Sequence, residues 1–411
     1  MVVTSHELPN NSLDVCALGA RSGLLWRSAD LTLAGLGTAD SAPVTLPSGT
    51  SAATTLLQTL ADRDSPVAPA HGPVGFVTLP FERGRPGEMI VPEIVVGTDG
   101  ESTWLTSVAD VSLDDALARV EACLTRPVPS GPHPTTFEMT SVLAPETWRD
   151  DIVAVARDRI AAGELNKAVL ARELTVTTNQ PFDVALVVDR LAARFPTAMI
   201  FAIDRFVAAS PELLVSRIDN VVRAHPLAGT APRSSNPAAD AELATNLLAS
   251  TKDQREHRIT IDWFLNELLP FCSYVDAEPE PTIVTMANVH HLGTAVEGVL
   301  SSPPASVLEL AGALHPTPAV GGDPQGEAID LIDELERADR GRYAGPTGWV
   351  DASGNGAFAV SVRSAQIGTE AEPCVTRLFA GVGVVADSDP AAELAETRAK
   401  FQAMLGALLQ P

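Results

Sequence analysis

The sequence predicts an α+β protein whose sheets are mostly antiparallel. Short apolar runs such as residues 74–79 and 198–203 are separated by glycine and proline, which is typical of strands joined by turns. Stretches with the 3.6-residue period of amphipathic helices are inserted between these runs. Strands in hairpin-like succession favour antiparallel pairing, and 411 residues suffice for two or three domains or for one large unit with subdomains.

The first third of the chain is predicted to hold strands followed by one helix. Residues 1–15 are polar, and we expect a disordered N-terminus there. From residue 16 to about 96 the apolar runs predict strands, and Ser112 begins a capping-box-like helix that reaches about residue 124. Residues 126–134 are rich in proline and break regular structure, so we place the main boundary there. It separates an N-terminal half at 16–134 from a second half at 135–411.

The second half is predicted to alternate between helices and strands. Helices are predicted at 145–162, 183–195, 239–269, 306–314 and 325–337. Strands are predicted at 165–172, 198–203, 207–209, 213–217, 282–286, 294–299, 348–351, 358–364 and 376–381. Gly163 and Pro196 end the first two helices, because neither residue continues a helix well.

The chain closes on a further predicted helix. Pro390 suits the first helical position behind a cap at Asp389 or Ser388, so the helix should run from residue 390 to about 409. At about 100° per residue, its apolar positions form one stripe that a core can bury. These positions are Leu394, Phe401, Leu405 and Leu408.

A second stripe of this helix carries charge. Glu393, Glu396 and Lys400 lie beside the apolar stripe, and on a lone helix such residues usually form a surface ion-pair ladder. Gly381 and Gly383 precede the helix, and glycines let a ligand approach bare backbone N–H groups. The combination favours a ligand site at which the carboxylates hold a metal.

Composition excludes several classes of function. Acidic residues outnumber basic ones 52 to 28, for a formal charge of −24, so nucleic acid and anionic membrane surfaces are not expected partners. A small anionic substrate would need local Arg, Lys or a divalent metal. No leader or long apolar segment is recognisable, and we expect a cytoplasmic protein. Four isolated cysteines are expected to be free thiols: Cys16, Cys123, Cys272 and Cys374.

Two titratable residues lie among apolar neighbours. Lys167, in Asn166-Lys-Ala-Val-Leu-Ala-Arg172, is either an edge-strand lysine kept for solubility or a desolvated general base. Glu212 follows a Ser-Pro turn, and it is either part of a capped turn or an acid whose pKa is raised by burial. A base and an acid together could add a nucleophile at one carbon while hydroxide leaves another.

Further polar residues could complete a site. Glu256 lies on a mixed-charge helix, which usually means a solvated face, but it could join Glu393 and Glu396 in an oxygen cluster suited to Mg²⁺. His290 and His291 lack the spacing of a zinc site, and His291 could donate to a ligand. Three more elements could contact a carboxylate or line a pocket: Tyr343, Arg363 and the turn Pro226-Leu-Ala-Gly-Thr230.

In order, these motifs resemble the chorismate-utilising enzymes, which include isochorismate, salicylate, anthranilate and aminodeoxychorismate synthases. The resemblance spans about residues 144–405, whereas the N-terminal third is similar only loosely. The motifs are Asn166-Lys-Ala-Val-Leu-Ala-Arg172, Ala209-Ser-Pro-Glu-Leu-Leu214, Pro226-Leu-Ala-Gly-Thr230, Lys252-Asp-x-x-Glu-His257, His290-His-Leu-Gly293, Arg340-Gly-x-Tyr-x-Gly345, and Ala380-Gly-Val-Gly383 with Glu393-x-x-Glu-x-x-x-Lys400. The resemblance implies two large, mostly antiparallel sheets packed together with helices outside, and a site in the cleft between them.

Within this family the residues favour water as the nucleophile. Ala228 stands where the aminodeoxychorismate branch has a nucleophilic lysine, and Lys167 stands where the ammonia-using anthranilate branch has an uncharged residue. Water attack leaves isochorismate synthase or salicylate synthase, and the stretch that contains Ala319 is similar to the isochorismate synthase pattern. We therefore predict an isochorismate synthase, with salicylate synthase or a non-catalytic chorismate-binding relative as alternatives. Menaquinone, siderophore and salicylate synthesis are the alternatives for the use of the product.

The resemblance implies a role for each matching residue. Lys167 would activate water for attack at C2, and Glu212 would protonate the departing C4 hydroxyl. Mg²⁺ would be bound by Glu256 and Glu396, with Glu393 nearby or acting through water. Substrate would be held by Ala228, Gly229, Thr230, His291, Ala319, Tyr343, Arg363, Gly381, Gly383 and Lys400. We expect no glutamine amidotransferase subunit, and a monomer or weak dimer.

Overall fold

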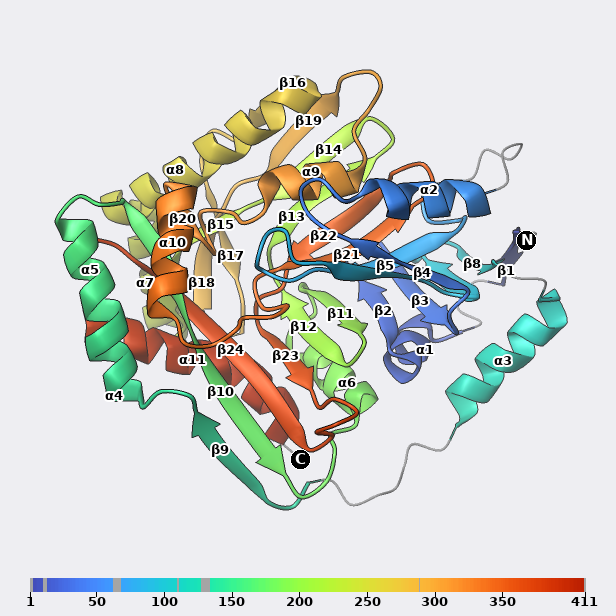
Figure 1. Cartoon of the computed structure of the whole chain (residues 1–411), viewed down its shortest axis with the longest axis horizontal. Coiled ribbons are helices and arrows are strands. Elements are labelled where there is room, and N and C mark those ends of the chain that lie inside the picture. Colours follow the sequence, from blue (N-terminus) through green and yellow to red (C-terminus); the bar gives the residue numbers. More distant parts are fainter. Residues whose placement is uncertain are drawn as a thin grey trace.

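Two large antiparallel sheets form the framework of the protein, as the sequence predicts. The structure is a computed structural model that describes residues 3–9, 13–61, 68–108, 111–126, 134–287 and 289–409. The sheets have 12 and 9 strands, and a small third sheet has 3. Helices lie around this framework (Figure 1). The predicted α+β class is therefore confirmed.

The 12-stranded sheet joins both predicted halves of the chain. It runs in the order β1-β8-β7-β3-β2-β11-β12-β23-β24-β10-β20, and β9 pairs with β10 off this path. Its strands are β1 (Thr4–Leu8), β2 (Leu24–Arg27), β3 (Thr32–Leu36), β7 (Ile94–Thr98), β8 (Thr103–Ser107), β9 (Phe137–Ser141), β10 (Lys167–Thr178), β11 (Met199–Ile203), β12 (Phe206–Ser210), β20 (Gly322–Asp323), β23 (Ser364–Ile367) and β24 (Val375–Val384). Since β2 pairs with β11, the two halves interlock. The predicted boundary at 126–134 lies mostly outside the described residues.

The second large sheet and the small sheet face the first. The 9-stranded sheet has the order β16-β19-β14-β13-β22-β21-β5-β6-β4, and the small sheet has the order β15-β18-β17. Their strands are β4 (Asp40–Val44), β5 (Val74–Thr78), β6 (Gly87–Val91), β13 (Leu213–Ile218), β14 (Val221–His225), β15 (Leu227–Pro232), β16 (Cys272–Ala277), β17 (Thr282–Thr285), β18 (Val289–Gly293), β19 (Val296–Leu300), β21 (Pro346–Asp351) and β22 (Gly356–Val360). Leu170 and Val382 of the first sheet share a buried cluster with Phe358 of the second. The large sheets therefore pack face to face through apolar side chains.

The helices cover the outside of the sheets. They are α1 (Val15–Ser22), α2 (Ser51–Leu60), α3 (Leu113–Thr125), α4 (Pro145–Thr147), α5 (Ala154–Ala161), α6 (Val184–Arg194), α7 (Pro237–Ala249), α8 (Thr251–Leu268), α9 (Val307–Leu314), α10 (Gln325–Leu335) and α11 (Pro390–Leu409). A π-helical turn, Trp148–Val153, connects α4 to α5, and a 3₁₀ turn, Leu269–Phe271, follows α8. In the described ranges, no helix combines the length and apolar character needed to cross a membrane. The last helix has the predicted bounds and packs against β24.

The prediction for the N-terminal region is wrong in two respects. Residues 4–8 form the edge strand β1, which pairs with β8, because backbone pairing orders this polar segment. The strand-only interpretation of residues 16–96 missed α1 and α2. The signals for α1 were present: Asp14 caps its first turn by accepting from Ala17 N at 2.9 Å, and Gly23 ends it at φ 82°.

The predicted single helix at 239–269 is also wrong, since it is two helices. Ser250 lies between α7 and α8 with extended backbone, and its hydroxyl oxygen accepts from Asp253 N at 3.2 Å. A serine that caps a new helix interrupts the helical backbone before it. The break starts α8 at Thr251, one turn before Glu256.

The predicted strand at 358–364 divides in the same way. β22 ends at Val360, and β23 begins at Ser364 after Arg363, whose φ of 50° is left-handed. This conformation is uncommon for a residue with a Cβ, and such positions are often found at functional sites. The strand break directs Arg363 into the cavity described below.

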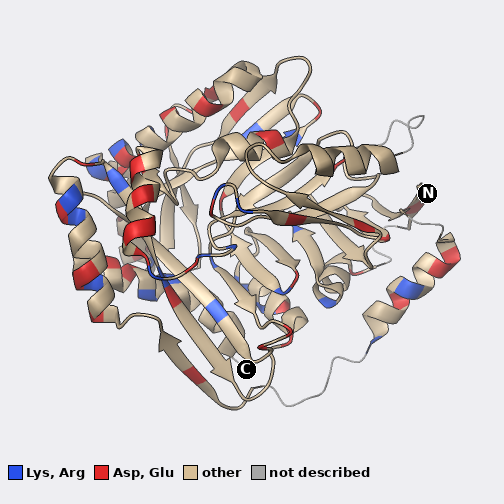
Figure 2. Ribbon diagram, in the orientation of Figure 1, with Lys and Arg blue, Asp and Glu red and all other residues tan. Residues whose placement is uncertain are grey.

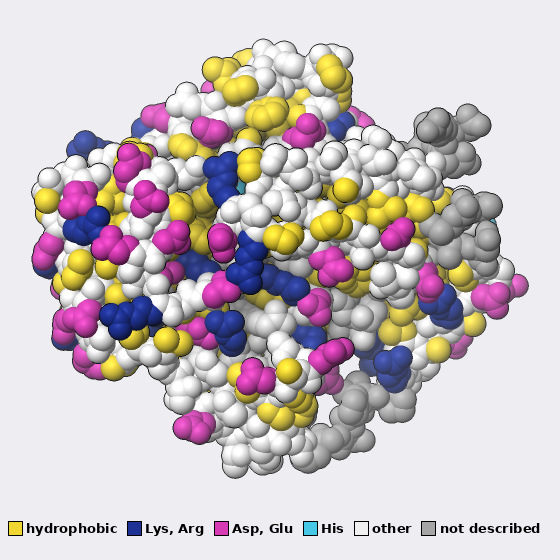
Figure 3. Space-filling model, viewed as in Figure 1, with side chains coloured by type: hydrophobic (Ala, Val, Ile, Leu, Met, Phe, Trp, Pro, Cys, Tyr) yellow, Lys and Arg dark blue, Asp and Glu magenta, His cyan; other side chains and the backbone are white. Residues whose placement is uncertain are grey.

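The negative charge is spread over the exterior. Acidic residues occur along outer helices such as α3 and α10 (Figure 2). On the face in Figure 3 they are scattered over the surface, whereas several basic side chains gather toward its middle. The charge of −24 therefore acts as a general repulsive field for anions.

Candidate active site

One cavity of about 220 Å³ collects all of the residues that the sequence analysis singled out for a site. It lies where β10 and β24 meet β15, β18, α8 and α11. The predicted residues that line it are Lys167, Glu212, Ala228, Gly229, Thr230, Glu256, His291, Ala319, Tyr343, Arg363, Gly381, Gly383, Glu393, Glu396 and Lys400. They come from the 12-stranded sheet, the small sheet, two helices and the connecting segments, so only the tertiary fold brings them together.

The cavity also concentrates the lysines of the protein. The 28 basic residues of the chain include only three lysines, Lys167, Lys252 and Lys400. All three line this cavity. In a chain of charge −24, they place positive charge in the cavity beside the acidic residues that also line it.

Five residues form what we call the sheet wall of the cavity: Lys167, Glu212, His291, Tyr343 and Arg363. Lys167 is half-buried on β10, diagonally across from Gly383 of the paired strand β24. A Cβ at position 383 would lie 2.7 Å from Lys167 Cε, so the glycine provides the space for the lysine chain. Burial lowers the pKa of Lys167, although the carboxylate of Glu256 opposes the shift. A lowered pKa increases the neutral fraction, which can accept a proton.

Glu212 is buried at the start of β13. Its backbone N–H donates to Ser210 Oγ at 3.2 Å, and the Ser210 hydroxyl donates to Val360 O at 2.6 Å. The side chain is only 5% exposed, and its Oε1 has no hydrogen-bond partner among the described residues. Burial raises the pKa of Glu212 to about 7, against the opposing charges of Arg363 and Lys167. Glu212 can therefore hold a proton near neutral pH and release it into the cavity.

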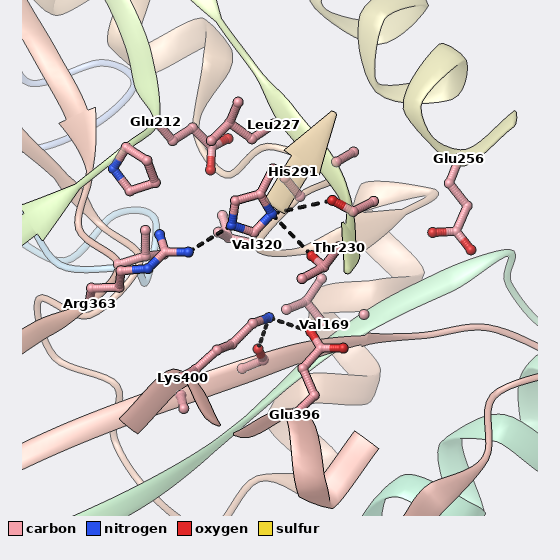
Figure 4. A pocket seen from close by; sticks show the side chains of 18 of the residues that line it. Val169, Glu212, Leu227, Thr230, Glu256, His291, Val320, Arg363, Glu396 and Lys400 are labelled. Atoms are coloured by element: carbon pink, nitrogen blue, oxygen red, sulfur yellow. Dashed lines mark hydrogen bonds and ion pairs between the residues drawn. The ribbon is translucent and has the colours of Figure 1, made fainter. Parts of the chain in front are cut away.

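His291 and Arg363 form a buried pair in the same wall. Arg363 Nη2 donates to His291 Nε2 at 2.7 Å. A guanidinium has no acceptor, so Nε2 must be unprotonated and the ring proton lies on Nδ1. Nδ1 is 3.1 Å from Thr230 Oγ1 and 3.3 Å from Gly229 O (Figure 4). Burial and the charge of Arg363 hold the pKa of His291 well below its ordinary value, so the ring is neutral.

Arg363 and Tyr343 are suited to an anionic ligand. Burial lowers the pKa of Arg363 to about 10, so the group stays charged at neutral pH, and its Nε has no partner among the described residues. Tyr343 stacks on Phe379 with ring centroids 5.3 Å apart, and burial raises its pKa to about 12. A Cβ at Gly381 would lie 3.0 Å from the Tyr343 hydroxyl. A carboxylate here would meet a fixed positive charge and a neutral hydroxyl donor.

Five charged residues of α8 and α11 form what we call the helix wall: Lys252, Glu256, Glu393, Glu396 and Lys400. Lys400 Nζ lies 2.7 Å from Glu396 Oε1 and donates to Gly381 O at 2.8 Å. Lys252 Nζ is 4.0 Å from Glu256 Oε1. Glu393 accepts from the Ser388 hydroxyl at 2.8 Å, and burial raises its pKa. Figure 4 shows Glu256 on the opposite side of the cavity from Glu396.

The helix wall has the donor chemistry of a magnesium site. Glu256, Glu393 and Glu396 supply hard carboxylate oxygens to one cavity. Among the described residues, however, no three His, Cys, Asp or Glu side chains are already grouped closely enough to hold a metal. Glutamates on helices can rotate into a common site, so the residues fit the metal by type, and Mg²⁺ stays a prediction.

Several lining residues were missed in the sequence analysis. They are Val169, Pro211, Leu227, Lys252, Asp253, Val320, Val362, Phe379 and Ala380. Val169 and Phe379 lie two positions from Lys167 and Gly381, so the period of two on a strand was a usable signal. Lys252 and Asp253 belong to a motif from which only Glu256 was chosen.

Comparisons with known proteins agree with this geometry. A family model described as "Chorismate binding enzyme" matches residues 14–409. Isochorismate synthase DhbC of Bacillus subtilis is 40% identical over 284 residues, which cover 66% of this chain and 70% of that protein. The structure of MenF, the menaquinone-specific isochorismate synthase from Escherichia coli, is 25% identical with a TM-score of 0.82, and the match covers 100% of this chain and 94% of that one. Anthranilate synthase component I from Streptococcus pneumoniae shares the fold, at 21% identity, a TM-score of 0.73 and coverage of 91% and 92%.

Proposed function

The chain belongs to the chorismate-binding enzyme family, and on that premise we propose that it is an isochorismate synthase, an isomerase that interconverts chorismate and isochorismate. The observation that carries the proposal is the pair of shifted groups in one cavity. Burial lowers the pKa of Lys167 and raises that of Glu212 to about 7. An amine whose pKa is lowered and a carboxyl whose pKa lies near 7 are suited to act as the base and the acid of the isomerisation.

The reaction exchanges one hydroxyl for another across the ring. Lys167 accepts a proton from water as the water oxygen bonds to C2. The ring double bonds shift, the C4–O bond breaks, and Glu212 gives its proton to the departing hydroxyl, which leaves as water. Because the substrate and product are isomers that differ in the positions of the hydroxyl and of the ring double bonds, the reverse reaction uses the same two groups with their roles exchanged.

Fixed charges in the cavity explain how an acidic protein would bind a dicarboxylate. Arg363, Tyr343 and the backbone N–H groups near Gly381 hold the enolpyruvyl carboxylate. His291 keeps Arg363 in place without adding charge, because its ring is neutral. On the helix wall, Glu256 and Glu396, with Glu393 nearby, would hold Mg²⁺. When bound, the metal supplies positive charge for the ring carboxylate.

Water is preferred over ammonia because a base is present. Ammonia needs no general base for attack, whereas water does. Ala228, which lines the cavity near Thr230, has no nucleophilic side chain. These residues favour a chain that acts without an ammonia-supplying subunit.

Product analysis tests the function directly. The purified protein is incubated with chorismate, with and without Mg²⁺, and the products are separated by chromatography. We expect a mixture of chorismate and isochorismate at equilibrium only when Mg²⁺ is present. Salicylate and pyruvate as the main products would instead identify a salicylate synthase. No conversion with Mg²⁺ would overturn the proposal and leave a chorismate-binding protein.

A further inference from the structure

One edge of β10 has a gap in its strand pairing next to Lys167. β24 pairs with β10 along Ala168 to Thr177, but the opposite edge is covered only at its ends. β20 pairs with Lys167 and Ala168, and β9 pairs with Leu174 to Thr178. Residues 169–173 therefore have no strand on that side among the described residues. Their outward backbone groups need other partners, because buried unpaired amides and carbonyls are costly.

Side chains take the place of the missing strand: Trp148 Nε1 donates to Ala171 O at 3.1 Å, and a linked pair, Arg340 and Glu336, bonds the groups on either side. Arg340 Nη2 donates to Val169 O at 2.6 Å, and Glu336 Oε1 accepts from Ala171 N at 2.6 Å. Arg340 Nε in turn donates to Glu336 Oε2 at 2.8 Å. Arg340 and Glu336 thus supply a donor and an acceptor of the kind that the backbone of a neighbouring strand would present to β10. We call this pair the edge clamp.

The edge clamp is buried and rigid. The side chains of Arg340 and Glu336 are only 4% and 6% exposed. The guanidinium carbon of Arg340 lies 4.1 Å from the centroid of the Phe81 ring, in cation–π geometry. Burial opposes the charge on Arg340, but Glu336 more than compensates, and the pKa of Arg340 is raised. The guanidinium is therefore a permanent, planar donor with fixed orientation.

The same guanidinium also bonds the Ala319–Val320 segment, which lines the cavity. Arg340 Nη1 donates to Val320 O at 3.0 Å, while Nη2 holds Val169 O. Val169 and Val320 both line the cavity, and Val169 shares a strand face with Lys167. One planar group therefore bridges the strand of the base and the Ala319–Val320 segment, beside the backbone bond from Val169 N to Gly321 O at 2.8 Å.

The turn that contains Arg340 also carries Tyr343 of the sheet wall. Tyr343 N donates to Arg340 O at 2.9 Å, so the turn that carries Arg340 also presents Tyr343 to the cavity. Displacement of Arg340 would shift Lys167 relative to Tyr343 as well as to Ala319. Proton transfer is sensitive to such displacement, because its donor and acceptor must meet within hydrogen-bond distance.

We propose that Arg340, oriented by Glu336, is a positioning residue. It fixes β10, the strand of Lys167, relative to Tyr343 and to the Ala319–Val320 segment. It touches no substrate, and it acts through the Val169 and Val320 carbonyls. The effect on turnover rests on the proposed function, whereas the effect on backbone order does not.

The decisive variant is Arg340→Lys. A lysine keeps the charge beside Glu336 but cannot bond both carbonyls in one plane. We expect kcat for chorismate conversion to fall by about 10²-fold with a smaller change in KM, because a displaced base impairs the chemical step. Glu336→Gln should retain more activity than Glu336→Ala, since an amide oxygen can still accept from Ala171 N.

The chain offers a matched control on the same strand. Arg377 pairs with Glu173 of β10, outside the catalytic cavity, with Arg377 Nη2 at 3.0 Å from Glu173 Oε2. Arg377→Lys should leave kcat within about twofold of the wild type while it perturbs the same strand. An equal loss of kcat in Arg377→Lys and Arg340→Lys, or wild-type kcat in Arg340→Lys, would overturn the proposal.

Amide hydrogen exchange provides a readout that needs no turnover. In Arg340→Lys we expect exchange to accelerate by about tenfold or more at residues 168–171 and 320–322 together, and not in Arg377→Lys. Unchanged exchange in both segments would refute the edge clamp even if activity fell. If the wild type does not convert chorismate, the proposed function fails, and the exchange experiment still decides the clamp.

Discussion

The sheet wall and the helix wall of the cavity differ in how they treat charge. On the sheet wall, Glu212, His291 and Arg363 are 5%, 8% and 8% exposed. Burial shifts the pKa of each of them toward the neutral form. On the helix wall, the side chains of Glu256 and Glu396 are 22% and 32% exposed, and each has a lysine four residues away on the same helix.

The difference corresponds to two kinds of chemistry. Proton transfer at neutral pH needs groups in their less common protonation state, and burial on paired strands provides both the shift and a fixed position. Binding a cation needs charged carboxylates that can adjust, and half-exposed side chains on helices keep both properties. The comparison predicts that substitutions on the sheet wall affect turnover most, and those on the helix wall affect metal affinity.

The largest expected effect is on the proton-transfer pair. Lys167→Ala and Glu212→Gln should each lower kcat by about 10²- to 10⁴-fold, because each removes a general base or acid. Binding of chorismate, measured by quenching of tryptophan fluorescence, should change little. Glu297→Gln, which alters an exposed ion pair with Arg223, is the control and should keep full activity. Substantial turnover in either sheet-wall variant would contradict the assigned roles.

The next test displaces Lys167 without replacing it. Gly383→Ala would put a Cβ 2.7 Å from Lys167 Cε, and the flexible lysine chain must move. We expect kcat to fall by about 10- to 10²-fold while the melting temperature stays nearly constant. Gly326→Ala is matched, because its Cβ would meet open space on α10. Wild-type kcat in Gly383→Ala would show that the position of Lys167 is not critical.

A smaller effect is expected on the helix wall. Glu256→Gln and Glu396→Gln should each weaken Mg²⁺ binding by about tenfold, because each replaces an anionic ligand with a neutral one. Titration calorimetry would measure the affinity. Asp262→Asn, on the exposed side of α8, and Glu212→Gln should bind Mg²⁺ like the wild type. Loss of affinity in Glu212→Gln alone would move the metal to the sheet wall.

The smallest effect concerns stability and pH. Burial raises the pKa of Glu212 from 4.5 to about 7, so its contribution to stability is fully present below pH 4.5 and is lost as the pH rises through 7. The side chain introduced by Glu212→Gln is neutral at every pH. The melting temperature of this variant should exceed that of the wild type by on the order of 3 °C at pH 8, and the difference should vanish near pH 4.5. A constant difference at both pH values would mean that Glu212 is not desolvated.

Local sequence signals predicted elements best where caps and periodicity coincide. The final helix has the predicted bounds, since Pro390 and the apolar stripe act within one segment. The helix predicted at 239–269 failed at Ser250, because the helical period continues across a capping serine. Residues 4–8 were missed as a strand, since their order depends on pairing with β8, about 100 residues away.

The residues that line the cavity were predictable from residue types and motif order, since all of the predicted residues meet there. Their chemical roles stay predictions. The left-handed backbone of Arg363, the tautomer of His291 and the unpartnered oxygen of Glu212 were not predictable. Each depends on a partner distant in sequence and on exclusion of water.

By itself, the sequence determined which functional groups are present, and it placed Lys167 on a strand and the charged residues of the helix wall on helices, because periodicity and capping are local. Only the tertiary structure decided the directions in which the pKa values of Lys167 and Glu212 shift, and the attachment of β10 to Arg340. Desolvation and hydrogen bonding act between segments that the fold alone brings within a few ångströms.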